Sequence, residues 1–124
     1  MPAVGRVPML QEGDFVLYES TAILAYLEAE YTQPPLAPAD ARQRALLDMH
    51  MKLCDIQLAR QAGTIMFSKR FLPKERWDEK AMAQAKVEIE KHLAIVEGQI
   101  AGKEYLVADR YTLAEICYTR MALT

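Results

Sequence analysis

Two short apolar runs separated by turn residues open the chain, and this pattern predicts a β-hairpin within residues 5–18. The first run covers residues 7–10, and the second, residues 15–18, is rich in strand-forming side chains. The four residues between the runs include Gly13, which can take a positive φ without steric cost.

After the hairpin the apolar spacing becomes helical. Ser20 is a candidate N-cap, and apolar side chains then recur every three or four residues as far as Tyr31. Residues 32–40 contain Pro34, Pro35 and Pro38 and show no periodicity, which is typical of a stiff linker. We therefore expect an N-terminal part, residues 1–31, and a C-terminal part, residues 41–124, joined by residues 32–40.

The C-terminal part has a helical pattern throughout. A first helix is predicted over residues 41–67, an interruption over 69–73, and a second helix from residue 74 or 75 to 101, with Gly102 just beyond its end. Thr112 and Glu115 match a capping box, which starts a third helix and is a folding element rather than a catalytic one. The predicted fold class is mainly α with a small β-hairpin (α+β).

Composition narrows the possible functions. The 124 residues are 52% hydrophobic and 26% charged, with a formal net charge of −2, which is typical of a globular protein. The small net charge and the lack of a basic stripe argue against nucleic acid as a partner. No apolar run approaches the roughly 20 residues of a membrane helix, and no signal-peptide pattern is present. We expect a cytoplasmic protein without a membrane segment.

The cysteines and histidines have structural and chemical interpretations. Cys54 and Cys117 fall on apolar helix faces and are expected to be reduced and buried, with a disulfide or a reactive thiol as the alternatives. His50 and Cys54 have an i, i+4 spacing that a metal could use, but two ligands do not make a site. We expect no metal and interpret His50 as a core histidine, and His92 and Trp77 as packing or surface residues.

The strand-to-helix turn at Glu19 and Ser20 offers groups for binding an α-amino acid. A helix N-terminus favours a carboxylate, the Ser20 hydroxyl adds a donor, and Glu19 can pair with an ammonium. The alternative is an ordinary N-cap beside an acidic residue.

The bond between Val7 and Pro8 is a second candidate feature. Val7 is held extended because it precedes a proline, and the bond between the two residues can be cis. The alternative is a trans proline at the start of a strand.

These segments resemble a known family. Residues 5–10 (GRVPML) and 17–27 (LYESTAILAYL) closely resemble the second half of the thioredoxin-like domain of glutathione transferases. The proline-rich linker and residues 111–116 (YTLAEI) also resemble the linker and the capping-box helix of that family. The resemblance spans nearly the whole chain. It implies the C-terminal half of a thioredoxin-like domain followed by an all-α helical domain.

The resemblance also implies roles for individual residues. Pro8 would be a cis-proline that presents the backbone of Val7 to the cysteinyl unit of glutathione. Glu19 and Ser20 would hold the γ-glutamyl group, and Arg6 would lie near the glycyl carboxylate. Glutathione is the implied ligand, and conjugation of glutathione to an electrophile is the implied activity.

One departure limits that expectation. In the family the thiol-activating residue precedes the Gly-Arg-Val-Pro stretch, whereas this chain starts four residues before Gly5. We therefore expect a chain truncated at both ends, assign no catalytic residue, and expect weak or no activity from it alone. A two-stranded hairpin is marginal by itself, so we also expect a homodimer, possibly with exchanged elements. The alternatives are a non-catalytic dimerisation or assembly module and a plain helical bundle without a ligand.

Overall fold

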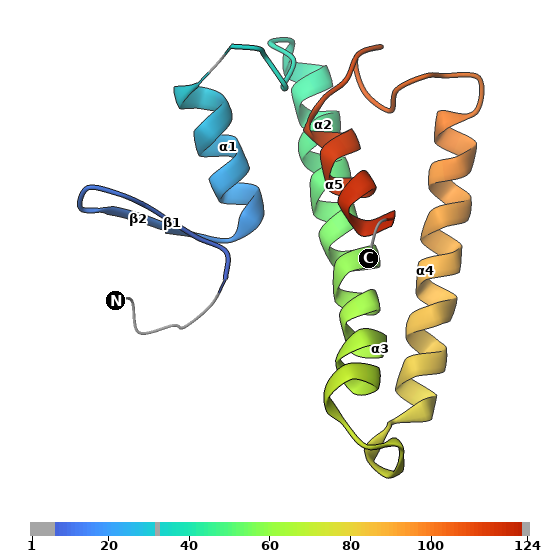
Figure 1. Ribbon diagram of the computed structural model, residues 1–124. Helices are drawn as coiled ribbons and strands as arrows, with labels where there is room; N and C mark the ends of the chain where they lie inside the picture. Colours follow the sequence, from blue (N-terminus) through green and yellow to red (C-terminus); the bar gives the residue numbers. More distant parts are fainter. Residues whose placement is uncertain (1–6, 32, 123–124) are drawn as a thin grey trace.

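A computed structural model describes residues 7–31 and 33–122 of the 124-residue chain, apart from the side chains of residues 120–122. The described part is mainly helical with one small β-hairpin, which confirms the predicted fold class (Figure 1). In chain order its elements are β1 (Met9–Glu12), β2 (Phe15–Tyr18), α1 (Ser20–Glu30), α2 (Ala41–Leu53), the π-helical segment η1 (Cys54–Ala59), α3 (Arg60–Phe71), the 3₁₀ turn η2 (Lys74–Arg76), α4 (Glu79–Ile100) and α5 (Leu113–Ala122).

The hairpin pairs β1 with β2 in antiparallel register, from Met9 opposite Tyr18 to Glu12 opposite Phe15. Its turn is shorter than the four residues predicted, because residues 11 and 12 continue the strand and only two residues connect it to β2. Gly13 takes a φ of 62° there, a conformation that glycine adopts without a Cβ penalty. The first strand begins at Met9 rather than residue 7.

The start of α1 differs from the prediction by one residue. Ser20 is its first helical residue, and Glu19 occupies the N-cap position with a φ of 69° and no side-chain capping hydrogen bond. The Glu19 carbonyl accepts from the Ile23 N–H at 3.0 Å, so the helical hydrogen bonds begin there. The end is close to the predicted position, since the Tyr31 N–H donates to the Leu27 carbonyl at 2.8 Å.

A buried carboxylate, that of Glu28, binds the backbone of the linker by hydrogen bonds. Glu28 in α1 is 8% exposed and accepts from the N–H groups of Leu36, at 2.9 Å, and Ala37, at 3.1 Å. The Leu36 carbonyl accepts from the Leu113 N–H at 2.9 Å, and the Ala37 carbonyl accepts from the Arg110 guanidinium at 2.9 Å. The described linker residues therefore connect α1 to the start of α5.

The first long helix is longer and less regular than predicted. α2, η1 and α3 follow one another without a break from residue 41 to 71, where a helix over 41–67 was expected. The helix ends because Leu72 precedes Pro73 and is extended (φ −114°, ψ 142°), which the proline ring imposes on the residue before it. Apolar spacing alone does not reveal the π-helical turn η1.

The next long helix starts later than predicted. Residues 74–76 form only the 3₁₀ turn η2, and α4 begins at Glu79. Asp78 is its N-cap, because the Asp78 carboxylate accepts from the Ala81 N–H at 3.0 Å. α4 ends at Ile100, and Gly102 follows with a φ of 73°, in the predicted position just past the helix end.

The hydrophobic core lies where α2, the loop before α5 and α5 meet. Leu47 on α2 is 1% exposed and Ala114 on α5 is not exposed at all. The buried core cluster consists of Ala37, Leu47, Met51, Val107, Leu113 and Ala114. α4 packs along η1 and α3, and α5 packs against α2 and η1 (Figure 1). Within residues 7–31 and 33–122, no helix combines the length and the apolar character needed to cross a membrane.

Candidate functional site

The peptide bond between Val7 and Pro8 is cis, directly before β1. Val7, on one side of this bond, is 92% exposed. Arg6, which the resemblance places near the glycyl carboxylate of glutathione, lies outside the described residues.

The turn between β2 and α1 has an unusual backbone. Glu19, with its φ of 69°, is in the left-handed region, which costs a non-glycine residue about 1–3 kcal/mol. This conformation leaves the Glu19 side chain exposed at the start of α1. Ser20 begins the helix, where the first backbone N–H groups have no helical acceptor and carry a partial positive charge. An acidic side chain is thus adjacent to a helix end whose partial charge favours anions.

A cavity of about 270 Å³ joins these features to the helical part. Pro8, at the cis bond, and Ser20, at the start of α1, both line it, and both come from the N-terminal part. The opposite wall is formed by Met51, Cys54, Asp55, Ala59, Ile116 and Cys117, from α2, η1 and α5. The structure therefore brings Pro8 and Ser20, twelve positions apart in the sequence, to the same cavity as residues from the helices.

The two cysteines face this same cavity. Cys54 is 3% exposed and Cys117 is half-buried, and no disulfide joins them. Their burial agrees with the expected helix faces. Their position beside Pro8 and Ser20 was not predicted, because no sequence pattern connects η1 and α5 to the hairpin.

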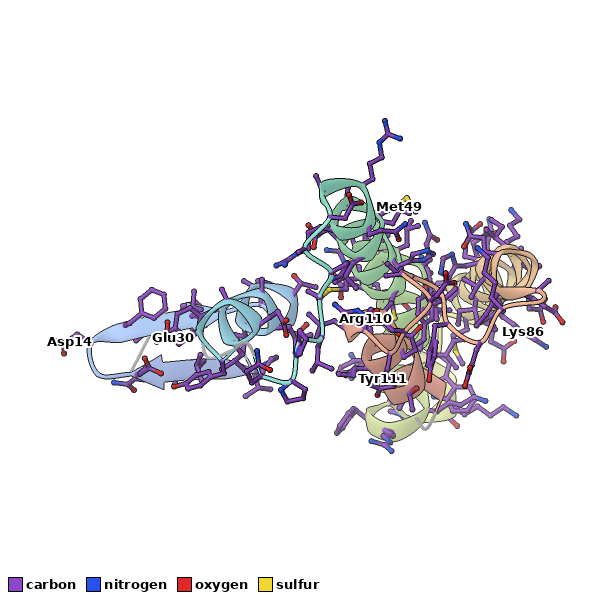
Figure 2. The ribbon with its side chains drawn as sticks, turned by 90° about the horizontal axis from the view of Figure 1, so that it is seen from above. Asp14, Glu30, Met49, Lys86, Arg110 and Tyr111 are labelled. Carbon is purple, nitrogen blue, oxygen red and sulfur yellow. The ribbon has the colours of Figure 1, made fainter. Side chains whose placement is uncertain are left out.

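Figure 2 shows how the two parts sit relative to each other. The tip of the hairpin, marked by Asp14, points away from the helical part. Arg110 lies where the linker meets α5, in agreement with its hydrogen bond to the Ala37 carbonyl. The candidate site is thus at the end of the hairpin nearer the helices, next to the N-terminus of α1.

Thr112 and Glu115 form a hydrogen-bonded cap at the start of α5. The Glu115 carboxylate accepts from the Thr112 N–H at 2.8 Å and from its hydroxyl at 3.0 Å. Its other oxygen accepts from the Leu106 N–H at 2.9 Å, and the Thr112 hydroxyl accepts from the Ala114 N–H at 3.2 Å. This cap fixes the start of the helix that supplies Ile116 and Cys117 to the cavity.

Both histidines of the sequence are buried in the helical part. His50 on α2 and His92 on α4 are each 5% exposed, so His92 is a buried residue and not a surface one. Tyr118 on α5 lies between them and was not singled out from the sequence. In the described residues, no group of three or more His, Cys, Asp or Glu side chains is arranged to hold a metal ion.

Comparison with known proteins gives the family. Residues 1–35 match the family model described as glutathione S-transferase, N-terminal domain, and residues 56–123 match the one described as glutathione S-transferase, C-terminal domain. Glutathione S-transferase Z1 of Arabidopsis thaliana is 32% identical over 119 residues, which cover 91% of this chain and 54% of that protein.

Solved structures of glutathione S-transferases are also similar to this chain. The theta class glutathione S-transferase of Xanthomonas axonopodis pv. citri, crystallised with glutathione bound, is 31% identical with a TM-score of 0.77, over 90% of this chain and 54% of that one. The beta-etherase LigF of Sphingobium sp. strain SYK-6 shares the fold, with a TM-score of 0.83 at 23% identity, over 96% of this chain and 62% of that one.

The chain belongs to the glutathione S-transferase family. β1, β2 and α1 form the C-terminal half of a thioredoxin-like domain, and the remaining helices form an all-α bundle of the family type. The chain spans about half the length of the curated relatives it matches.

Proposed function

We propose that this chain binds the γ-glutamyl-cysteinyl portion of glutathione with Val7, Pro8, Glu19 and Ser20. The observation that carries the proposal is that Pro8, at the cis bond, and Ser20, at the N-terminus of α1, line one cavity. A relative 31% identical to this chain was crystallised with glutathione bound, which supports the choice of ligand.

Each group of the ligand has a chemically suitable partner. The α-carboxylate of the γ-glutamyl unit would accept from the N–H groups at the start of α1 and from the Ser20 hydroxyl. The exposed carboxylate of Glu19 would pair with the α-ammonium. The backbone of Val7 would pair with the cysteinyl unit in the manner of an added strand. Arg6 is proposed for the glycyl carboxylate on the family resemblance alone.

We further propose that the longer protein conjugates glutathione to an electrophile as a cytoplasmic homodimer. The mainly apolar wall opposite Ser20 suits an apolar electrophile. We assign no residue of these 124 to activation of the thiol. We therefore expect this chain alone to bind glutathione but to turn over substrates weakly or not at all. The division into residues 1–31, 32–40 and 41–124 is part of the same proposal.

A non-catalytic dimerisation or assembly module is the second candidate. Phe67 and Phe71 on α3 favour it, because they are 57% and 70% exposed and their ring centroids lie 5.4 Å apart. Exposed apolar side chains that occur together are typical of interaction surfaces. This candidate predicts self-association that does not depend on glutathione.

Isothermal titration calorimetry with millimolar glutathione separates the two candidates. We expect saturable binding, weakened about tenfold or more by Ser20→Ala, because a hydrogen bond to a charged group contributes roughly 1.5–3 kcal/mol. Thr64→Ala, at an exposed position on α3, is the control and should leave binding unchanged. No binding to the unmodified chain, together with a dimer in light scattering, would favour the assembly module.

A further inference from the structure

Three aromatic side chains meet inside the helical part, and we call His50, His92 and Tyr118 the histidine cluster. His92 Nε2 and the Tyr118 hydroxyl oxygen lie 2.8 Å apart, and the two rings are stacked with centroids 5.9 Å apart and 16° between their planes. His50 meets the edge of Tyr118, with a centroid distance of 6.4 Å and an angle of 70°. The cluster therefore connects α2, α4 and α5.

The ring nitrogen Nδ1 of His50 is buried without a hydrogen-bond partner among the described residues. His50 as a whole is 5% exposed. A buried polar atom without a hydrogen-bond partner destabilises the fold, and a buried charge without one destabilises it more. The neutral form of the imidazole is the one this site tolerates.

We propose that the histidine cluster is an acid-sensitive contact, in which protonation of His50 and His92 loosens α5 from α2 and α4. Loosening α5 would also displace Ile116 and Cys117, which form part of the cavity wall. The proposal does not require that the cavity bind glutathione.

The charged and titratable groups around His50 explain why a proton would not be accommodated easily. Burial lowers the pKa of His50, and the neighbouring His92 and Lys103 lower it further, while Glu115 opposes them. The Glu115 carboxylate already accepts from three donors, Leu106 N–H, Thr112 N–H and the Thr112 hydroxyl. Among the described groups that shift the pKa of His50, Glu115 is the only carboxylate. A protonated His50 would therefore compete for Glu115 with the hydrogen bonds that cap α5.

The other members of the cluster add no compensating negative charge. Burial lowers the pKa of His92 and raises the pKa of Tyr118, so Tyr118 stays a neutral phenol throughout the acid range. Tyr118 can hydrogen-bond a protonated His92 but cannot neutralise it.

The direction of the pH effect follows from these shifts. Because both histidines have lowered pKa values in the folded protein, the unfolded chain takes up protons first, near its ordinary pKa of about 6.5. The stability that the neutral histidines contribute is therefore fully present above about pH 7. It is lost as the pH falls from there through the pKa values of His50 and His92 in the folded protein. We add the amounts by which folding lowers the pKa values of His50 and His92. The equilibrium constant for unfolding should rise about tenfold for each pKa unit of that sum.

Urea unfolding of the chain between pH 5 and pH 7.5 tests the proposal. The sequence has only two histidines, so a histidine titration in this range must come from the cluster. We expect the urea midpoint to fall with pH in the unmodified chain and to be nearly independent of pH in the double variant His50→Phe, His92→Gln. Ala94→His, at an exposed position on α4, is the control and should retain the pH dependence of the unmodified chain.

Two further measurements make the test decisive if the double variant does not fold. NMR titration of the imidazole Cε1–H signals in the unmodified chain should give pKa values below that of the added histidine in Ala94→His. Hydrogen exchange, corrected for intrinsic rates, should show α5 amides losing protection at pH 5.5 before those of α3. Imidazole pKa values at or above the ordinary value, or a midpoint that does not change between pH 7.5 and 5, would overturn the proposal.

Discussion

The two parts of the chain are stabilised in different ways. Within residues 7–31 of the N-terminal part, Glu28 is the one buried residue, and Val7, Met9 and Phe15 are exposed. The helical part contains most of the buried core, including Leu47, which is 1% exposed. Since burial of apolar side chains is the main source of stability, the helical part should be the more stable one.

The N-terminal part, which we expect to be the less stable one, carries the proposed glutathione-binding groups. The cis bond at Pro8 and the left-handed backbone of Glu19 both lie there. The left-handed conformation of Glu19 persists only when surrounding structure holds it in place. Glu28 connects α1 through the linker to α5, and Leu24 packs against the buried core. We infer that the helical part supports the geometry of the candidate site.

The largest expected effect is on the core of the helical part. Leu47→Ala should lower the free energy of unfolding by about 2–5 kcal/mol, because it leaves a cavity at a fully packed position. Urea denaturation followed by circular dichroism measures this. Leu46→Ala, at the next position but 42% exposed, is the matched control and should change stability by less than about 1 kcal/mol. Equal losses in the two variants would contradict the placement of the core.

A smaller effect is expected at the junction between the two parts. Glu28→Ala leaves the N–H groups of Leu36 and Ala37 without their acceptor and should cost about 1.5–3 kcal/mol. Hydrogen exchange at these two amides should accelerate more than exchange in α3. Glu30→Ala, at an exposed position on the same helix, should leave both amides protected. If Glu28→Ala left them equally protected, the carboxylate would not be what connects α1 to the linker.

The smallest expected effect concerns the exposed contact between the hairpin and α1. The Glu12 carboxylate accepts from the hydroxyls of Tyr26, at 2.9 Å, and Tyr31, at 3.2 Å. The hydrogen bond to Glu12 is the main cause that raises the pKa of Tyr26 to about 12 and also raises that of Tyr31. In Glu12→Gln the pKa of Tyr26 should fall back toward 10, because the acceptor loses its negative charge.

NMR titration of ring-labelled tyrosine measures this change. The raised pKa means that the contact contributes its full stability below pH 10 and loses it between pH 10 and about 12. Asp14→Asn, in the turn of the same hairpin, is the control and should leave the Tyr26 titration unchanged. A Tyr26 signal that titrates identically in all three proteins would show that Glu12 does not hold the hairpin to α1.

Features that depend on residues close together in sequence were largely predictable. The hairpin, the position of Gly102 after α4 and the cap of α5 at Thr112 follow from turn chemistry, apolar spacing and a capping pattern within four residues. Errors occurred where two local signals competed. Ser20 was expected to cap α1, but Glu19 occupies that position, and Asp78 rather than residue 74 or 75 sets the start of α4.

By itself, the sequence determined the fold class and was enough to propose Pro8, Glu19 and Ser20 as binding groups, because a proline, a strand-to-helix turn and their family pattern are local. Only the tertiary structure decided what lies opposite them. The cavity wall with Cys54 and Cys117, the hydrogen bonds from Arg110 and Leu113 to the linker, and the histidine cluster all join segments far apart in the chain. Which distant side chains meet depends on how the helices pack, and no short-range spacing encodes that.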